Sequence, residues 1–242
     1  MGAISGINEK RSTPDHPVFK HASVLFLEYC SGGSLSAFLR SRLDHEQHRG
    51  SGRHEKYGRL SESEALWVAE CAGRALVYLK EKRIIHRDIK VGNLLLQSAV
   101  EPGRDILKTG IVLCDFGLSK QLAPGETHSK GSSGTPSHVS PEVYLEDRAT
   151  FAADVWALGV TLFTCLNGRS PFHESDSSYM RYKIVHAEYK WSSATKKCLS
   201  PNVRNLVDDL IERNVEHRLT AEGLLGRLAA MRDAQPSISA RK

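Results

Sequence analysis

The chain has 242 residues, of which 40% are hydrophobic and 25% charged, so it can bury a sizeable core, as soluble globular proteins do. Its five cysteines are odd in number and never spaced C-x-x-C, which argues against a disulfide framework and a zinc knuckle and favours a reducing compartment. The net charge of +5 is mild. It is compatible with an acidic or phosphorylated partner, but a solvated surface is the simpler interpretation, and we expect no nucleic-acid partner.

Neither a signal peptide nor a membrane span is predicted. The N-terminal residues lack a long apolar core, and the longest apolar stretch, residues 155–166, is too short to cross a bilayer. We therefore expect an intracellular, cytoplasmic protein with no membrane partner.

Residues 1–15 are polar and show no periodic pattern, and we expect a loose N-terminal segment over residues 1–21 ahead of one domain over residues 22–232. Residues 24–27 (VLFL) are apolar and predict a buried strand. The Gly-Gly pair at 32–33 then allows a sharp turn into a short helix over residues 34–42.

Residues 44–59 are rich in His, Arg, Gly and Glu and have no apolar period, which predicts an exposed loop. Its three histidines could be taken for metal ligands, but no helix or strand fixes their spacing, so a metal site is the weaker interpretation. They are His45, His48 and His54.

A long amphipathic helix is predicted after this loop. Ser61 and Glu64 have the spacing of a capping box, and apolar residues recur behind them at helical intervals. Further along, residues 94–96 and 111–114 are short apolar runs, which predict a pair of strands.

Residues 151–167 are apolar nearly all round and end in Asn-Gly, a strong helix stop, so this helix should be buried at the centre of its domain. Two amphipathic helices are predicted beyond it, around residues 203–211 and 224–231. Residues 233–242 form a polar tail.

The strongest functional signal lies in two short motifs, each behind an apolar run. Residues 86–93 have the sequence HRDIKVGN, and residues 115–117 are DFG. Phosphoryl transfer needs a carboxylate to orient an attacking hydroxyl and accept its proton, and oxygen ligands to hold Mg²⁺ on the phosphates of ATP. Asp88 suits the first task, and Asn93 and Asp115 suit the second. A lone Asp in a loop is usually a turn residue, but the two motifs in this order argue for catalysis.

At these residues the sequence resembles the eukaryotic protein kinases, whose catalytic loop has the pattern H-R-D-x-x-x-x-N and whose metal loop is D-F-G. The resemblance covers residues 22–232 and implies an α+β, mainly α, fold that corresponds to the hinge and the large C-terminal lobe. It implies ATP and Mg²⁺ as cofactors and proteins as substrates. Lys90 would neutralise charge on the transferred phosphoryl group. Thr135 would bond to Asp88 and Lys90, and both assignments favour Ser and Thr as acceptors.

The resemblance also assigns the segment before the first helix to the hinge that contacts adenine. It implies main-chain contacts to adenine from Glu28 and Cys30, with Leu27 at the back of the nucleotide pocket and Leu95 at its floor. Cys114 would face the same cleft, although a buried inert thiol is the simpler interpretation.

Further structural roles follow from the same resemblance. Glu142, in a Ser-Pro-Glu segment like the A-P-E of the family, would pair with a buried Arg218. Asp154 could simply cap its helix, but the resemblance places it beneath the catalytic loop, bonded to the loop's backbone. Arg87 would bind a phosphate added to the segment that follows the DFG motif.

The small lobe of the family is almost absent from the sequence as given. Ahead of Val24 there is no Gly-rich loop, no strand Lys and no helix Glu, the parts that cover ATP and clamp its phosphates. The sequence therefore predicts a serine/threonine protein kinase that is truncated and impaired as written, or one whose missing lobe a partner supplies. The alternative is a non-catalytic, pseudokinase-like interaction module. A kinase of lipids or small molecules ranks last, because it has no need of the Gly-Thr-Pro and Ser-Pro-Glu segments.

Overall fold

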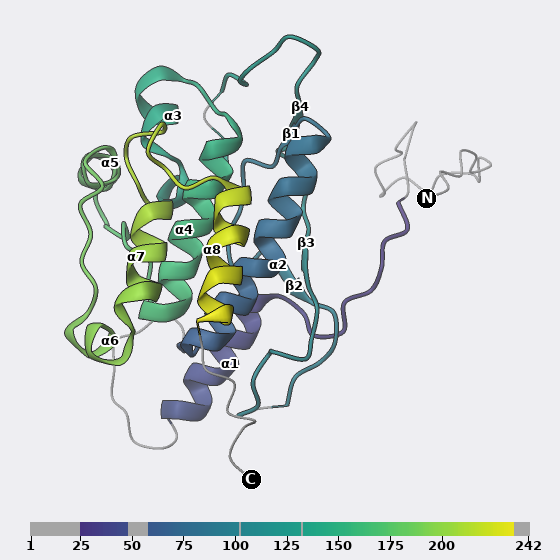
Figure 1. Ribbon diagram of the computed structural model, residues 1–242, viewed down its shortest axis with the longest axis vertical. Helices are drawn as coiled ribbons and strands as arrows, with labels where there is room; N and C mark the ends of the chain where they lie inside the picture. Colours follow the sequence, from purple (N-terminus) through teal and green to yellow (C-terminus); the bar gives the residue numbers. More distant parts are fainter. Residues whose placement is uncertain (1–24, 48–57, 102, 132, 235–242) are drawn as a thin grey trace, which may run out of the picture.

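The computed structural model describes residues 25–47, 58–101, 103–131 and 133–234. Within these ranges the chain forms eight α-helices, one 3₁₀ helix and four short strands (Figure 1). The strands make two separate two-stranded ladders, and no larger sheet is present among the described residues. The α+β, mainly α, fold class predicted from the sequence is confirmed.

Two long helices form the centre of the fold, α2 (Glu62–Glu81) and α4 (Phe151–Asn167). They pack against one another, while α8 (Ala221–Asp233) packs on α2 and α7 (Pro201–Leu210) packs on α4. In Figure 1 these four helices lie with their axes roughly aligned. Their shared interior is the main hydrophobic core of the described chain.

Helix α2 begins where the capping box predicts. The Oγ of Ser61 accepts a hydrogen bond from the backbone N–H of Glu64, and a Glu64 carboxylate oxygen accepts one from the backbone N–H of Ser61 at 2.9 Å. Arg42, in α1 (Leu35–Gln47), donates two hydrogen bonds to the same carboxylate at 2.7 and 2.8 Å. The buried Glu64 is therefore fully paired, and this pair joins α1 to the start of α2.

Helix α4 is buried nearly all round, as its composition predicts, with Trp156 and Phe163 fully enclosed. The side chain of Thr150 caps its first turn. The helix ends at Gly168, which has a φ of 78°, a left-handed conformation that glycine adopts without a steric cost.

The four strands bring the two motifs together. Strand β1 (Ile84–Ile85) pairs antiparallel with β4 (Lys120–Gln121), and β2 (Leu94–Leu96) pairs antiparallel with β3 (Ile111–Leu113). The HRDIKVGN motif lies between β1 and β2, and the DFG motif lies between β3 and β4. Each motif is thus held at both ends by a ladder that it shares with the other. The predicted pairing of residues 94–96 with the run from 111 is confirmed, although β3 ends at Leu113 rather than at Cys114.

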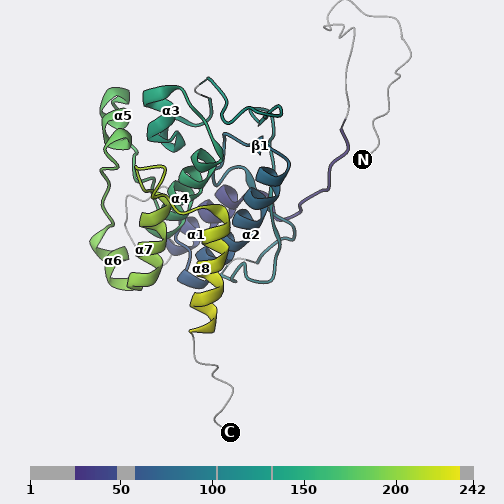
Figure 2. The ribbon, with the colours of Figure 1, turned by 45° about the horizontal axis from the view of Figure 1, so that its top comes forward.

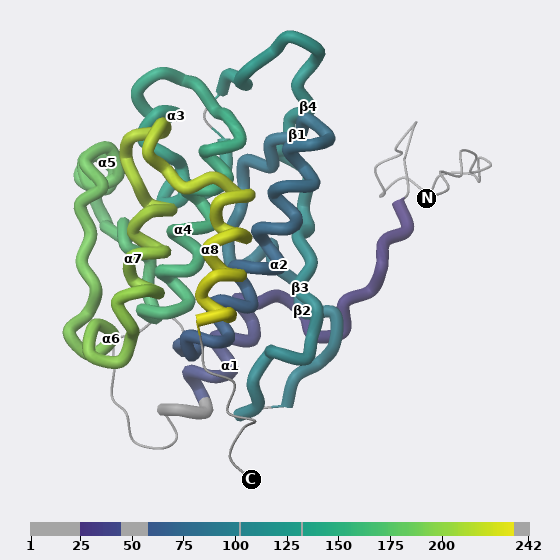
Figure 3. Tube along the Cα trace, viewed as in Figure 1, coloured from purple at the N-terminus to yellow at the C-terminus, as the bar shows by residue number. Residues whose placement is uncertain are grey.

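The smaller helices surround this centre. Figures 1 and 3 place α5 and α6 at one edge and β2 and β3 at the other, and Figure 2 shows α5 and α6 on the side away from β1. None of the described helices combines the length and apolar character that crossing a membrane requires. The remaining elements are the 3₁₀ helix η1 (Pro136–His138), α3 (Pro141–Glu146), α5 (Ser177–Val185) and α6 (Ser193–Cys198).

The segment before α1 differs from its prediction. Residues 25–30 form no strand, and Leu25, Phe26 and Leu27 are 78%, 76% and 75% exposed. In Figures 1 and 2 this segment leads away from the helices. The prediction of a buried strand is wrong for residues 25–27, because no other described segment pairs with them or covers their side chains. Val24 lies outside the described residues.

Helix α1 is longer than predicted. It ends at Gln47 rather than at residue 42, so the start of the predicted loop is helical. Leu35, Leu39 and Leu43 are buried one helical turn apart, and this apolar face carries the helix past its predicted end. His48 and His54 lie outside the described residues, as do the predicted loose segment and most of the predicted polar tail. Among the described residues, no group of three or more His, Cys, Asp or Glu side chains could hold a metal ion.

Candidate active site

The loop between β1 and β2 is fixed from beneath by Asp154 of α4. Its two carboxylate oxygens accept hydrogen bonds from the backbone N–H groups of His86 and Arg87 at 2.7 and 2.8 Å. Asp154 is 3% exposed, and burial raises its pKa to about 6, although these two hydrogen bonds favour the charged form. The structure therefore agrees with the predicted position of Asp154 beneath the loop, while Thr150 provides the helix cap.

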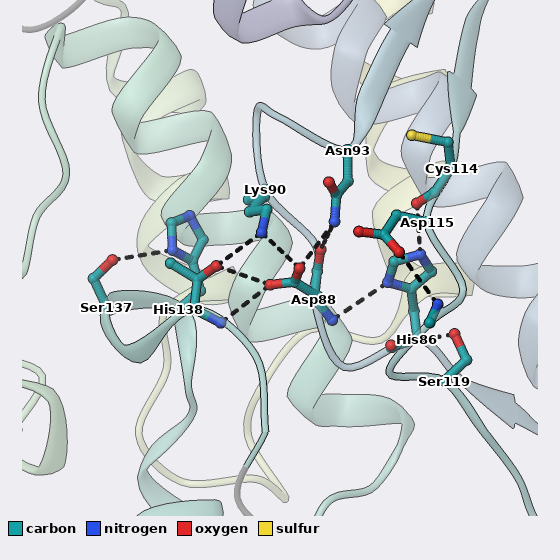
Figure 4. A network of polar contacts seen from close by, with 11 residues as sticks. His86, Asp88, Lys90, Asn93, Cys114, Asp115, Ser119, Ser137 and His138 are labelled. Atoms are coloured by element: carbon teal, nitrogen blue, oxygen red, sulfur yellow. Dashed lines mark hydrogen bonds and ion pairs between the residues drawn. The ribbon is translucent and has the colours of Figure 1, made fainter. Parts of the chain in front are cut away.

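Asp88 lies at the centre of a convergent set of donors (Figure 4). Its carboxylate accepts hydrogen bonds from Lys90 Nζ at 2.6 Å, Thr135 Oγ1 at 2.8 Å and Asn93 Nδ2 at 3.0 Å. The backbone N–H of Thr135 adds a further bond at 3.1 Å. Burial alone would raise the pKa of Asp88, but the hydrogen bonds from Lys90 and Thr135 outweigh it and lower the pKa. The carboxylate is thus held in its ionised form and in one orientation.

Lys90 and Thr135 join the catalytic loop to the segment ahead of α3. Lys90 Nζ donates to Thr135 Oγ1 at 3.1 Å as well as to Asp88, which gives the three-residue contact that the family resemblance implies. Gly134 makes this approach possible. Its φ is 102°, and a Cβ at this position would lie 2.2 Å from the carbonyl oxygen of Arg87.

Asn93 and Asp115 are the candidate metal ligands. Asn93 Nδ2 donates to the carbonyl of Asp88 at 2.8 Å as well as to its carboxylate, so the amide oxygen of Asn93 is turned away from these two acceptors. Asp115 is exposed, and one of its carboxylate oxygens accepts from the backbone N–H of Gly117 at 3.2 Å. The backbone N–H of Cys114 donates to the Asn93 carbonyl at 2.9 Å, which ties the two motifs together. One amide and one carboxylate oxygen suit Mg²⁺, which usually takes few protein ligands and completes its shell with phosphate and water.

His86 connects the same two motifs through its side chain, a role that the sequence did not assign. Its Nε2 lies 3.0 Å from the carbonyl oxygen of Cys114, and its ring meets the Phe116 ring edge-on with centroids 4.9 Å apart. Burial lowers the pKa of His86, which favours a neutral ring here. The sequence signal for this role was the position of His86 in the HRD motif. Its contacts with Cys114 and Phe116 could not be predicted from that position, because they form only when folding brings the two loops together. Cys114 itself is half-buried, and burial raises the pKa of its thiol.

A second polar cluster joins α3 to the segment between α7 and α8. Arg218 donates two hydrogen bonds to Glu142, at 2.8 Å to Oε1 and 2.9 Å to Oε2, and both side chains are buried. The pair predicted from the family resemblance is therefore present. Arg87, the other predicted arginine, donates to the Leu118 carbonyl at 2.6 Å and to Ser129 Oγ at 3.2 Å.

The predicted adenine contacts lie apart from this network. Leu27 is exposed, Cys30 and Leu95 are half-buried, and a Glu28 carboxylate oxygen accepts a hydrogen bond from Gln97 at 3.1 Å. The turn after Cys30 is held against β2, since the backbone N–H of residue 32 donates to the carbonyl of residue 96 at 3.1 Å. Leu95 lies in β2, shortly after Asn93 in the chain, whereas the side chain of Leu27 is exposed and packs against no described part of the site.

The loop that carries Asp88 and the DFG loop are thus held by paired short strands and bonded to the buried helix α4, the arrangement expected of the large lobe of a protein kinase. The sequence of residues 11–227 matches the family described as "Protein kinase domain", and the chain therefore belongs to the protein kinase family. The match begins ahead of residue 22, where the domain was predicted to start. The recognition made from the two motifs is confirmed.

Several serine/threonine-protein kinases are similar to this chain. It is 28% identical over 229 residues to serine/threonine-protein kinase 33 of Mus musculus, covering 93% of this chain and 44% of that protein. It is 32% identical over 198 residues to serine/threonine-protein kinase ATG1a of Arabidopsis thaliana, covering 81% and 28%. It is 31% identical over 201 residues to serine/threonine-protein kinase PLK2 of Mus musculus, covering 83% and 25%. The chain spans less than half the length of these relatives.

Proposed function

We propose that this chain transfers the γ-phosphate of ATP to serine and threonine hydroxyls of protein substrates. The observation that carries the proposal is the Asp88 carboxylate, which is ionised and oriented by Lys90, Thr135 and Asn93 within hydrogen-bond distance. A carboxylate held in this way can orient a substrate hydroxyl and accept its proton.

In the proposed reaction the hydroxyl oxygen bonds to the γ-phosphorus while the bond to the β,γ-bridging oxygen breaks and ADP leaves. Asp88 takes the proton of the hydroxyl, and Lys90, whose Nζ is 2.6 Å from the Asp88 carboxylate, would stabilise the charge on the transferred group. Asn93 and Asp115 would hold Mg²⁺, which neutralises charge on the phosphates. Leu27, Glu28, Cys30 and Leu95 remain the proposed adenine contacts. An intracellular, cytoplasmic location fits such a reaction.

Phosphate transfer from radiolabelled Mg-ATP to a generic protein substrate, followed by phosphoamino-acid analysis, tests this proposal. Label on serine and threonine that requires Mg²⁺ is the expected result. Label on tyrosine alone, or transfer that proceeds without any divalent cation, would contradict it.

A second candidate is a non-catalytic interaction module. It is favoured by the exposed apolar side chains of Leu25, Phe26, Leu27 and Tyr29, which another protein could cover. A partner of this kind could equally complete the nucleotide site of an active kinase. A folded, monodisperse chain that shows no transfer, alone or with a separately supplied small lobe of a related kinase, would favour the interaction module.

A further inference from the structure

A cavity of about 430 Å³ opens beside the catalytic Asp88, and its lining is basic. Lys90 and Thr135, which both contact Asp88, form one wall, so the cavity adjoins the point where an acceptor hydroxyl would lie. Arg169 and His173, from the segment after α4, form another wall. Among the residues that the structure describes, no Asp or Glu side chain lines this cavity.

Several other residues that line the cavity are uncharged. Ser36 comes from α1, Gly92 from the loop itself and Thr164 from the last turn of α4. The hydroxyl of Thr164 is committed to its own helix, where it donates to the carbonyl of Val160 at 2.8 Å. A basic peptide side chain entering here would therefore meet no carboxylate of the lining.

Arg169 is the cation best placed for a ligand. It is exposed, and within the described part of the chain it makes no ion pair or hydrogen bond. It also borders a neighbouring cavity that contains Glu174 and Glu188, but Glu174 is bonded to Lys183 at 2.7 Å and Glu188 accepts from Tyr182. The guanidinium of Arg169 is left with its donors available for an anion.

We propose that this cavity, here called the basic cavity, binds an anionic side chain of the protein substrate, a carboxylate or a phosphate, close to the acceptor residue. The inference rests on the proposed kinase function and names its substrate class. An extended chain advances 3.3–3.6 Å per residue, so a cavity of this size adjoining the acceptor site is reached within about three residues of the acceptor. Arg169 supplies the main charge, and Lys90 and His173 border the bound group.

The test compares peptides of equal length that carry one serine flanked by glutamates, by phosphoserines or by lysines. Their affinity for the whole chain is measured by fluorescence anisotropy at fixed ionic strength, because exposed charge pairs weaken with salt. We expect the acidic or the phosphorylated peptide to bind about tenfold more tightly than the lysine peptide, the gain typical of a charge-assisted hydrogen bond to arginine. Whichever of the glutamate and phosphoserine peptides binds more tightly identifies the anion that is recognised, a carboxylate or a phosphate.

Arg169→Gln should remove most of this preference, whereas the matched control Arg74→Gln, on the exposed face of α2, should leave it intact. Equal or tighter binding of the lysine peptide, an unchanged preference in Arg169→Gln, or binding of none of the peptides would overturn the proposal. The two proposals fail separately. If the serine peptides are phosphorylated equally whatever their charge, the kinase function stands and anion binding in the basic cavity is refuted. If the acidic peptide binds more tightly but no phosphate is transferred, anion binding stands and the kinase function is refuted.

Discussion

The buried pair of Glu142 and Arg218 offers the most quantitative prediction. Arg218 is fully buried and binds Glu142 through two hydrogen bonds, and it also donates to the carbonyls of Ala152 and Glu212 at 2.9 and 2.8 Å. Its guanidinium lies 5.2 Å from the ring of Trp156. Removing the carboxylate in Glu142→Ala would leave a positive charge in the interior that cannot reach water.

Breaking such a pair from one side costs about 3–5 kcal/mol of unfolding free energy, which is a large part of the 5–15 kcal/mol typical of a whole domain. For a domain of this size each kcal/mol lowers Tm by about 2–4 °C, so the expected fall is about 6–20 °C. Thermal unfolding followed by circular dichroism measures it.

The matched control is Glu146→Ala, because Glu146 is an exposed residue of the same short helix α3. It should shift Tm by no more than a degree or two. The double variant Glu142→Leu with Arg218→Met should recover much of the loss, because neither partner is then left charged and unpaired. An unchanged Tm in Glu142→Ala would refute the assignment of this pair as a buried structural contact.

Three further outcomes are expected. Because the pKa of Asp154 is raised to about 6, the stability that its protonation contributes is present at low pH and is lost as the pH rises toward 6. The wild type should therefore lose stability relative to Asp154→Asn between about pH 4 and 6, and a pH-independent difference in Tm would contradict this. Gly134→Ala should lower stability by about 1–3 kcal/mol and depress activity through its contact with Arg87, whereas Gly226→Ala, which meets open space in a helix, should be neutral or slightly stabilising in denaturant titrations. Asp115→Asn should raise the Mg²⁺ concentration needed for half-maximal phosphate transfer several-fold, and an unchanged requirement would exclude Asp115 as a ligand.

Much of the fold was predictable because its signals are local. The capping box at Ser61 fixed the start of α2, and the apolar run ending in Asn-Gly located α4 together with its left-handed Gly168. Strands β2 and β3 were predicted from their apolar runs, whereas β4 (Lys120–Gln121) is polar and was not predicted. The pairing of Glu142 with Arg218 could not come from spacing, since 76 residues separate them, and it rested on the family resemblance.

What the sequence did not predict depends on contacts between distant segments. Residues 25–27 have the composition of a buried strand, but burial requires a neighbour, and the described chain provides none. The extension of α1 depends on the burial of Leu43 against the rest of the domain. His86 and Gly134 owe their roles to the approach of separate loops, which no local pattern records.

The rate of phosphate transfer by Asp88→Asn, relative to the wild type, tests the central claim most directly. Asn keeps the size of the side chain but cannot accept the proton, so the rate of transfer to serine and threonine should fall by a factor on the order of 10²–10⁴. Asp105→Asn, a change of the same kind in an exposed turn, should leave the rate unchanged. A wild-type chain whose transfer survives intact in Asp88→Asn would contradict the assignment of Asp88 as the catalytic residue.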